Sequence, residues 1–198
     1  LIMERKKWPE LNELVVCTVS NIVDFGAFVK LDEYEGKEGL IHISEVASGW
    51  IKYIRDHVRE GQKIVCKVLH VDPGKGHIDL SLKDVNEHQR REKIQEWKNK
   101  QKASRWIQLV AESINLAPEL RIDLENRLYA IYGNPYLAFE DAAMNGEEAL
   151  VKQGIEKTLA EGIAKIAREN VKIPSVDITG YVDLICPAPN GIEIIKKA

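Results

Sequence analysis

The sequence predicts a multidomain chain in which a five-stranded β-barrel is followed by an all-helical domain and by the beginning of an α/β domain. Between residues 13 and 82, short apolar runs rich in β-branched residues alternate with turn residues, which is typical of strands. From residue 86 onward, apolar residues recur at helical spacings, and from residue 171 the alternation of a strand returns. We place the domains at residues 1–85, 86–172 and 173–198.

Five strands are expected in the first domain. In the last of them, apolar residues at 78, 80 and 82 alternate with polar residues at 77, 79 and 81, which is the period of a half-buried strand. A longer excursion, residues 44–61, separates the third strand from the fourth, and this arrangement suits a small closed barrel of the OB type. Such barrels bind single-stranded nucleic acid or oligosaccharide on a strand face. The expected strands are residues 13–20, 25–31, 37–43, 64–71 and 77–82.

Two phenylalanines lie close together in the second expected strand. On a strand surface, Phe25 and Phe28 could stack on bases, and stacking tolerates any sequence because every base has a π-face. Gly26 lets a ligand or a neighbouring backbone approach closely. The alternative is that the two rings belong to the barrel core. Their opposite pleat parity indicates that at least one of them could be core, so the residues alone leave both interpretations open.

The second domain is expected to consist of helices. Asn86 can cap the first one, with Gln89 three residues on completing a capping box, and we expect a break or bend at residues 101–104. A turn at residues 116–119 leads into a second helix, which ends at Gly133 because glycine permits a left-handed stop. Further helices are expected at residues 136–144 and 147–170, the latter interrupted near Gly154.

The last segment changes character again. Residues 171–185 alternate like a strand, residues 186–191 (CPAPNG) form a turn, and residues 192–198 begin an amphipathic helix. One strand and one helix cannot bury a core alone. We therefore expect this segment either to pack on the helical domain or to open a third, α/β domain, and the chain, which starts with Leu, to be a piece of a longer protein.

Charge constrains the partners. With 28 basic and 31 acidic residues the net charge is −3, whereas free-standing nucleic-acid binders usually carry a basic excess. Any RNA affinity is therefore expected to be weak and salt-sensitive. Within residues 86–105, seven Lys and Arg oppose three Glu, a local charge of 7 − 3 = +4. That run is either a solvated helix face or an edge that tracks phosphates beside the barrel.

Signs of catalysis are missing from the sequence. The Gly-Lys-Gly at 74–76 is too short for a phosphate-binding P-loop, and the five His show no metal-ligand spacing. We expect no enzyme activity, no catalytic residue, no metal and no cofactor. No run of 18 apolar residues occurs, so no membrane contact is expected. Cys17, Cys66 and Cys186 lack CxxC spacing and are interpreted as buried reduced thiols of a cytoplasmic protein.

The barrel segments DFGAFV (24–29), GKEGLIHISE (36–45) and VD (71–72) resemble, in this order, the S1-type RNA-binding domain. The resemblance implies an RNA-binding patch of Phe25, Phe28 and His42, with Asp72 and a basic residue near its rim. His77 stands at that rim position, where many family members have Arg. A weaker phosphate contact is expected at neutral pH, because His carries less positive charge there than Arg.

The whole chain resembles the alpha subunit of archaeal translation initiation factor 2, through the order of its domains and segments such as KGHIDLS (75–81) and CPAP (186–189). This resemblance implies a non-catalytic subunit of a heterotrimer, with messenger RNA and the small ribosomal subunit as further partners. The gamma subunit would bind GTP and initiator methionyl-tRNA. Alpha would attach to gamma through the α/β domain, most of which is absent from this chain, and its barrel and helices would extend towards the RNA.

The excursion after the third strand is a candidate for regulation and RNA contact. In eukaryotic relatives a serine of this loop is phosphorylated, and alignment on residues 44–46 places Ala47 there, flanked by Ser44 and Ser48 as possible phosphorylation sites. Lys52 and Arg55 are candidate RNA contacts, with solvated surface as the alternative.

A different function also stays open, that of a general S1-type RNA-binding module of another RNA-processing or degradation complex. Partner choice separates the two functions.

Overall fold

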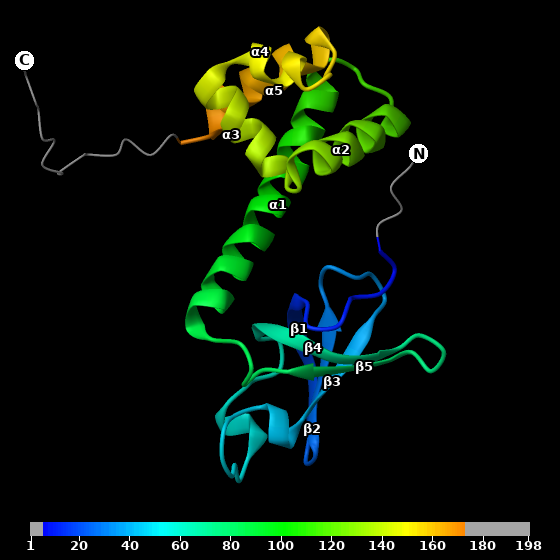
Figure 1. The fold of residues 1–198 in the computed structure, drawn as a ribbon, viewed down its shortest axis with the longest axis vertical. Coiled ribbons are helices and arrows are strands. Elements are labelled where there is room, and N and C mark those ends of the chain that lie inside the picture. Colours follow the sequence, from blue (N-terminus) through cyan, green and yellow to red (C-terminus); the bar gives the residue numbers. More distant parts are fainter. Residues whose placement is uncertain (1–5, 173–198) are drawn as a thin grey trace, which may run out of the picture.

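The computed structural model describes residues 6–172. A barrel lies at one end of these residues and a cluster of helices at the other, and one long helix joins them (Figure 1). This order of a barrel followed by helices confirms the predicted fold class for the described part. The predicted opening of an α/β domain at residues 173–198, together with Cys186, lies outside the described residues, and the domain boundaries themselves stay predictions.

Five strands close into a barrel in the order β1-β2-β3-β5-β4. All neighbours pair antiparallel except β3 and β5, which run parallel and meet at Leu40 and Asp79. The long connection between β3 and β4 holds two single-turn 3₁₀ helices, η1 (Ile43–Glu45) and η2 (Ile54–Asp56). The strands are β1 Leu14–Val23, β2 Gly26–Leu31, β3 Glu38–His42, β4 Lys63–Asp72 and β5 His77–Ser81.

Alternation along the strands fills the barrel with apolar side chains. In β2, Ala27, Val29 and Leu31 are buried, whereas Phe28 is partly covered and Lys30 is exposed. In β5, Ile78 and Leu80 are buried as the alternation predicts, but Ser81 is buried too, where an exposed side chain was expected. The strand ends at Ser81, and its Oγ accepts a hydrogen bond from the N–H of Asp84 in the turn that leads out of the barrel.

The first helix, α1, runs without interruption from Glu87 to Ser113, and the predicted break at residues 101–104 is wrong. This stretch contains no Gly or Pro, and Ala103 is fully buried on the same face as Ile107 and Val110. Burial at these helical spacings continues the apolar stripe through the polar residues around it. The predicted capping box is present, since Asn86 and Gln89 exchange side-chain to backbone hydrogen bonds.

Four shorter helices pack around the second half of α1. Their core contains Phe139, and the Trp106 ring lies 5.5 Å from the Tyr136 ring and 5.3 Å from the Phe139 ring. Gly133 ends α2 with φ of 74°, and Gly154, with φ of 91°, lies in the predicted interruption between α4 and α5. The helices are α2 Pro118–Tyr132, α3 Pro135–Asn145, α4 Glu147–Lys152 and α5 Lys157–Asn170.

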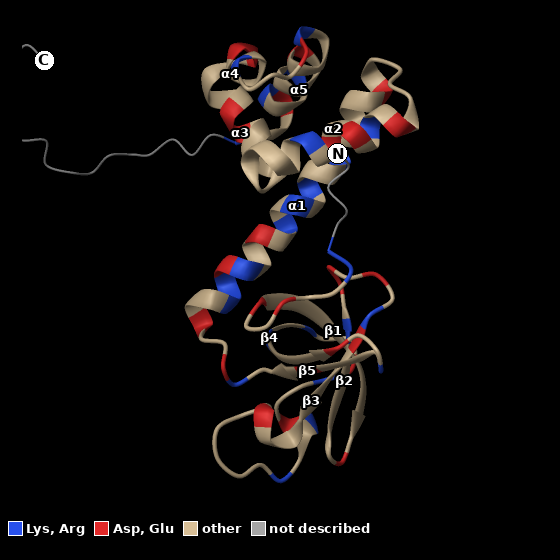
Figure 2. Ribbon diagram, turned by 45° about the vertical axis from the view of Figure 1, so that its right-hand side comes forward, with Lys and Arg blue, Asp and Glu red and all other residues tan. Residues whose placement is uncertain are grey.

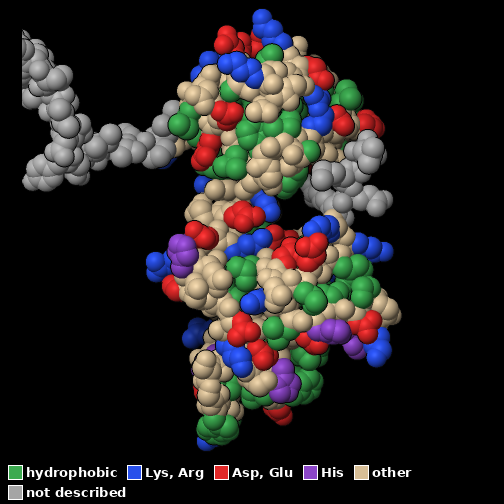
Figure 3. Space-filling model, viewed as in Figure 1, with side chains coloured by type: hydrophobic (Ala, Val, Ile, Leu, Met, Phe, Trp, Pro, Cys, Tyr) green, Lys and Arg blue, Asp and Glu red, His purple; other side chains and the backbone are tan. Residues whose placement is uncertain are grey.

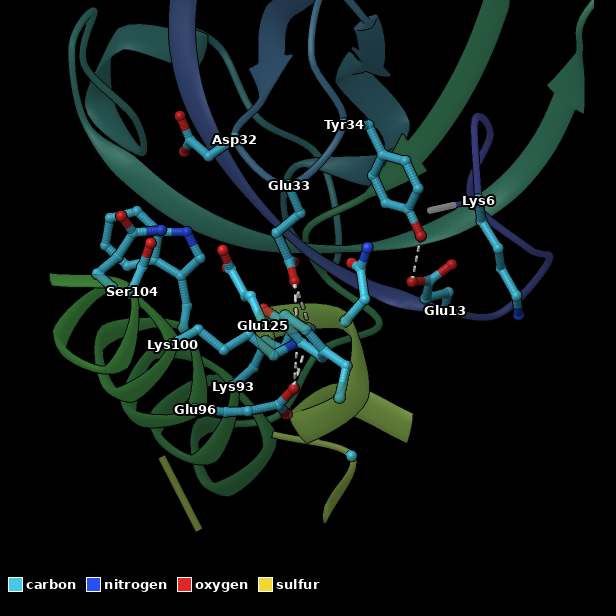
Figure 4. Close-up of a pocket in the computed structure, with 15 residues that line it drawn as sticks. Lys6, Glu13, Asp32, Glu33, Tyr34, Lys93, Glu96, Lys100, Ser104 and Glu125 are labelled. Atoms are coloured by element: carbon cyan, nitrogen blue, oxygen red, sulfur yellow. Dashed lines mark hydrogen bonds and ion pairs between the residues drawn. The ribbon is translucent and has the colours of Figure 1, made fainter. Parts of the chain in front are cut away.

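The first half of α1 lies against β1 and β4 (Figure 2). Charged side chains and the Trp97 ring make this contact, which we call the joint (Figure 4). Its centre is Glu33, in the connection after β2. Lys93 lies 3.0 Å from Glu33 and Lys100 lies 3.9 Å from it, and both lysines also pair with Glu96. The other Glu33 oxygen accepts a hydrogen bond from the N–H of Val16 in β1, so this one carboxylate ties helix to barrel.

A second contact of the joint involves Lys63 of β4. Its ammonium lies 4.5 Å from the centre of the Trp97 ring on α1 and donates hydrogen bonds to Asp32 and Thr18. The basic run of α1 is therefore neither wholly solvated nor wholly free to track phosphate. Lys93 and Lys100, whose side chains are 12% and 22% exposed, face carboxylates inside the molecule.

Candidate nucleic-acid interface

The two phenylalanines lie outside the barrel core. Phe25 precedes β2, in the turn that follows β1, and is 52% exposed, while Phe28 in β2 is half-buried. Their ring centres are 6.2 Å apart and the ring planes stand at 86°, an edge-to-face pair. Pleat parity does not apply to Phe25, because that residue belongs to the turn. The interpretation that one of the rings is core is therefore wrong.

Gly26 brings the third strand against this pair. A Cβ on Gly26 would stand 2.5 Å from the carbonyl oxygen of Ile41, so no larger residue fits without moving β3. Gly26 is opposite His42 in the ladder, which puts the exposed imidazole beside the two Phe. The N–H of Ser44 donates to Nδ1 of His42 over 3.2 Å, so that nitrogen is an acceptor and the neutral ring carries its proton on Nε2.

A shallow groove of about 260 Å³ runs from Phe28 to β5. His77 lies on its far side and is opposite Asp72 in the β4–β5 ladder. Asp72 itself accepts a hydrogen bond from the N–H of Lys75, which closes the hairpin turn. The lining of the groove includes Leu40 and two acidic residues, Glu38 and Asp79. The lining residues are Phe28, Glu38, Gly39, Leu40, Gly76, His77, Ile78 and Asp79.

The remaining candidates lie in the connection between β3 and β4. Lys52 is exposed, with its ammonium 5.3 Å from the Tyr53 ring. Arg55 donates to the carbonyl oxygen of Ile22 over 3.5 Å and pairs with Glu60 over 3.3 Å, so part of its charge is used within the barrel. Ser48 is exposed in the loop, and the Ser44 hydroxyl lies 2.7 Å from Nδ1 of His42.

The structure thus brings together some predicted residues and separates others. Phe25, Phe28 and His42 form one cluster, and His77 joins it through the groove. Asp72 pairs with His77 across the β4–β5 ladder and accepts the hydrogen bond that closes the hairpin turn. Lys52 and Arg55 belong to the loop at the same end of the barrel as the β1–β2 turn (Figures 1 and 2).

Sequence reasoning did not select Leu40, which lines the groove. Its outward direction follows from the alternation of β3, in which Gly39 and Ile41 are buried. Charge on the visible face is mixed, with Lys and Arg interspersed among Asp and Glu and not gathered into one basic patch (Figure 3).

A second hollow, of about 730 Å³, lies at the joint between the barrel and the helices (Figure 4). It contains none of the sequence-predicted site residues, and its lining includes the ion pairs of Glu33 and Glu96 with Lys93 and Lys100 already described.

Within residues 6–172 no group of His, Cys, Asp and Glu could hold a metal ion. The same residues include no helix of the length and apolar character that crossing a membrane requires.

Cys17 and Cys66 are buried free thiols, as predicted. A hydrogen bond with Cys66 and burial raise the pKa of the Cys17 thiol, which keeps it protonated and unreactive at neutral pH.

Two family models match the chain. The model described as S1 RNA binding domain matches residues 9–83, and the model described as eukaryotic translation initiation factor 2 alpha subunit matches residues 121–198. The translation initiation factor 2 subunit alpha of Archaeoglobus fulgidus is 52% identical over 198 residues, which cover all of this chain and 74% of that protein.

Two solved structures show the same arrangement. The intact alpha subunit of aIF2 from Pyrococcus abyssi is 42% identical with a TM-score of 0.78, covering 98% of this chain and 74% of that one. A chain in the a/eIF2alpha-aDim2p-rRNA complex from Pyrococcus horikoshii is 45% identical with a TM-score of 0.74, covering 84% of this chain and 99% of that one.

Proposed function

This chain belongs to the family of archaeal translation initiation factor 2 alpha subunits, and on that premise we propose that it acts without catalysis in a heterotrimeric initiation factor. In this role it supports the GTP-dependent delivery of initiator methionyl-tRNA to the small ribosomal subunit, in the cytoplasm. The observation that carries the proposal is a relationship that extends over the whole chain, barrel and helices together, and not over the RNA-binding barrel alone.

The proposed mechanism adds binding area to a complex. The cluster of Phe25, Phe28 and His42 offers rings to bases of messenger RNA or transfer RNA, with His77 at the far side of the groove. Because the chain has a net charge of −3, its own RNA affinity is weak. Attachment to the gamma subunit, through the α/β domain predicted to begin at residue 173, raises the effective concentration of the barrel at the RNA, so weak contacts still tighten the assembly.

The experiment measures that coupling directly. Initiator methionyl-tRNA is titrated against gamma–GTP with and without the complete alpha subunit. Tightening of tenfold or more, about 1.4 kcal/mol, is the expected result. An unchanged dissociation constant, together with no co-purification of alpha and gamma, would reject the proposal. The variant Phe28→Ala then tests whether the aromatic cluster contributes, with the exposed Met144→Ala on the helical domain as the matched control.

Phosphorylation would act beside the cluster of Phe25, Phe28 and His42. A phosphate on Ser44 would bring roughly two negative charges beside His42, whose Nδ1 lies 2.7 Å from that hydroxyl. We propose that this modification, or that of Ser48 in the same loop, weakens RNA contact by repelling phosphates. Replacing Ser44 by Asp and measuring RNA affinity checks the direction, with Ser113→Asp on α1 as a control far from this cluster.

A second candidate function is RNA binding outside initiation. The observation that favours it is the related chain found in a complex with aDim2p and rRNA. As a general RNA-binding module, the chain would bind generic single strands without the gamma subunit and would show no preference for initiator transfer RNA. Competition between initiator transfer RNA and an unrelated single strand of equal length separates the two functions.

A further inference from the structure

The loop between η1 and η2 exposes two aromatic rings that the proposed RNA face does not include. Trp50 is 85% exposed and Tyr53 is 58% exposed. Lys52 lies between them in the sequence, with its ammonium 5.3 Å from the Tyr53 ring. Large apolar rings left in water usually mark a contact surface when they gather. We call Trp50, Lys52 and Tyr53 the loop platform.

The outward position of the loop platform is built into the fold. Val46 before it and Ile54 after it are buried in the barrel core, and Ile51 packs partly against that core. With Ile51 directed inward, Trp50 and Lys52 on either side of it face water. Gly49 has φ of 83°, a left-handed turn that any side chain would strain, and it sets the direction of the chain at Trp50.

The loop platform adjoins the aromatic cluster. The N–H of Ile43, where the loop begins, donates to the carbonyl oxygen of Phe25 over 2.8 Å. At the other end, Arg55 reaches the carbonyl oxygen of Ile22, in the hairpin that carries Phe25. Both views place this loop and the β1–β2 turn at the same end of the barrel (Figures 1 and 2). A strand lying on Phe28 and Phe25 would therefore meet the loop next.

The chemistry of the loop platform fits single-stranded RNA. Flat rings beside a cation match base stacking next to a phosphate backbone. Residues 46–53 contain Lys52 and no Asp or Glu, whereas the groove beside Phe28 contains Glu38 and Asp79. Of the two surfaces, the loop platform repels phosphate less.

We propose that Trp50 and Tyr53 form a second stacking site for single-stranded RNA, continuous with the Phe25–Phe28 cluster, with Lys52 contacting the backbone. The inference rests on the proposed function and extends it. The RNA takes a path from the groove of β3 and β5, over the β1–β2 turn, onto the loop, and the loop platform supplies the affinity that the acidic groove lacks.

The test titrates the full chain into a fluorescein-labelled oligouridylate of about 12 nucleotides, a length within the span that such barrels cover. Trp50→Ala is expected to weaken binding about 5- to 100-fold, from the usual worth of one stacked base. Trp50→Phe keeps a flat ring and should bind within about 3-fold of the parent, while Trp50→Leu keeps apolar area without a π-face and should fail like Ala. Lys52→Ala should lower the salt slope by about 0.7.

Two further variants make failure interpretable. Met144→Ala removes a residue that is 68% exposed on the helical domain and should bind like the parent. Phe28→Ala tests the cluster of the proposed function. If Phe28→Ala weakens binding and Trp50→Ala does not, the loop platform is rejected while the proposed function stands. If Trp50→Leu binds like the parent, stacking is rejected and a protein partner fits the surface better. If the parent shows no affinity at low salt, the loop platform is rejected, while the proposed function is decided separately by the titration of initiator methionyl-tRNA against gamma–GTP.

Discussion

The first half of α1 contacts the barrel through charged side chains, whereas the second half contacts α2–α5 through apolar ones. Lys93 and Lys100 of α1 form ion pairs with Glu33 of the barrel. Further along the same helix, Ile107 is fully buried among apolar side chains of the other helices. Salt and pH act on the first kind of contact and hardly on the second. The helix is therefore packed stably in the helical domain, whereas the strength of its contact with the barrel depends on salt and pH.

The largest effect is expected from the apolar half. Ile107→Ala should lower the free energy of unfolding of the helical domain by about 2 to 5 kcal/mol, because it leaves a cavity in a fully buried site. Denaturant unfolding followed by amide exchange of each domain measures this. Leu109→Ala, at a position 39% exposed on the same helix, should change stability by less than about 0.5 kcal/mol. An equal loss of amide-exchange protection in the barrel would show that the barrel and the helical domain unfold as one unit.

A smaller energy but a larger movement is expected at the joint. Glu33→Gln removes the charge that pairs with Lys93 and keeps an oxygen for the N–H of Val16. The loss of a charged hydrogen bond in a partly covered site corresponds to about 1 to 2 kcal/mol.

The separation of barrel and helices should broaden in the Glu33→Gln variant. Spin labels at Lys75→Cys and Lys152→Cys, in a Cys186→Ser background, report the distance distribution. Glu161→Gln, in an exposed pair within α5, should leave that distribution unchanged. An unchanged distribution in Glu33→Gln would mean that the apolar half alone orients the barrel.

The cation–π contact of the joint should contribute less. Trp97→Leu keeps apolar bulk beside Lys63 and removes the ring face, so a loss of about 0.5 to 1 kcal/mol is expected. Trp97→Phe should recover part of it. Chemical denaturation measures the loss at low and high salt. A loss that is the same for Phe as for Leu would identify lost packing, and not the ring face, as its cause.

Acid should loosen the joint by the smallest amount. Burial raises the pKa of Glu96, but the hydrogen bond from Lys100 and the nearby lysine charges outweigh it and hold this pKa below its ordinary value. A carboxylate with a lowered folded-state pKa stabilises above the unfolded value, about 4.3, and that contribution is lost as pH falls through the folded value.

The effect is limited because the Glu96 side chain is 45% exposed and therefore screened by solvent. The distance distribution between the two labels should broaden as the pH falls below the unfolded value of about 4.3. In Glu96→Gln this pH dependence should be smaller, whereas an identical dependence in both proteins would contradict the assignment to Glu96.

Local patterns predicted the barrel and most helices, because alternation and capping act between residues that are near in sequence. The continuity of α1 was missed because Gln101, Lys102 and Ser104 are polar, although Ala103 carries the buried stripe through them. The joint could not be predicted, since its central pair joins residues 60 apart, Glu33 and Lys93, that meet only once the barrel has closed.

The RNA-binding residues were selected by resemblance, and their roles stay predictions. Position along a strand could not decide the environment of Phe25, because this residue belongs to the turn and β2 begins one residue later, at Gly26. The exposure of Trp50 could not be predicted either, since it depends on Ile51 packing against the barrel.

Because α1 is unbroken, it also fixes the rotation of the barrel about the helix axis relative to the helical domain. Its 27 residues span about 40 Å, and each residue turns the helix by about 100°. Deleting one residue near Gln101 would shorten the span by only about 1.5 Å, yet it would rotate the proposed RNA-binding face of the barrel by about 100° about the helix axis. Inserting seven would lengthen it by about 10 Å and return that face to nearly the same bearing. The length of the helix therefore sets the rotation of the barrel relative to the helical domain as well as their separation. Insertions or deletions of seven residues should be tolerated better than those of one residue.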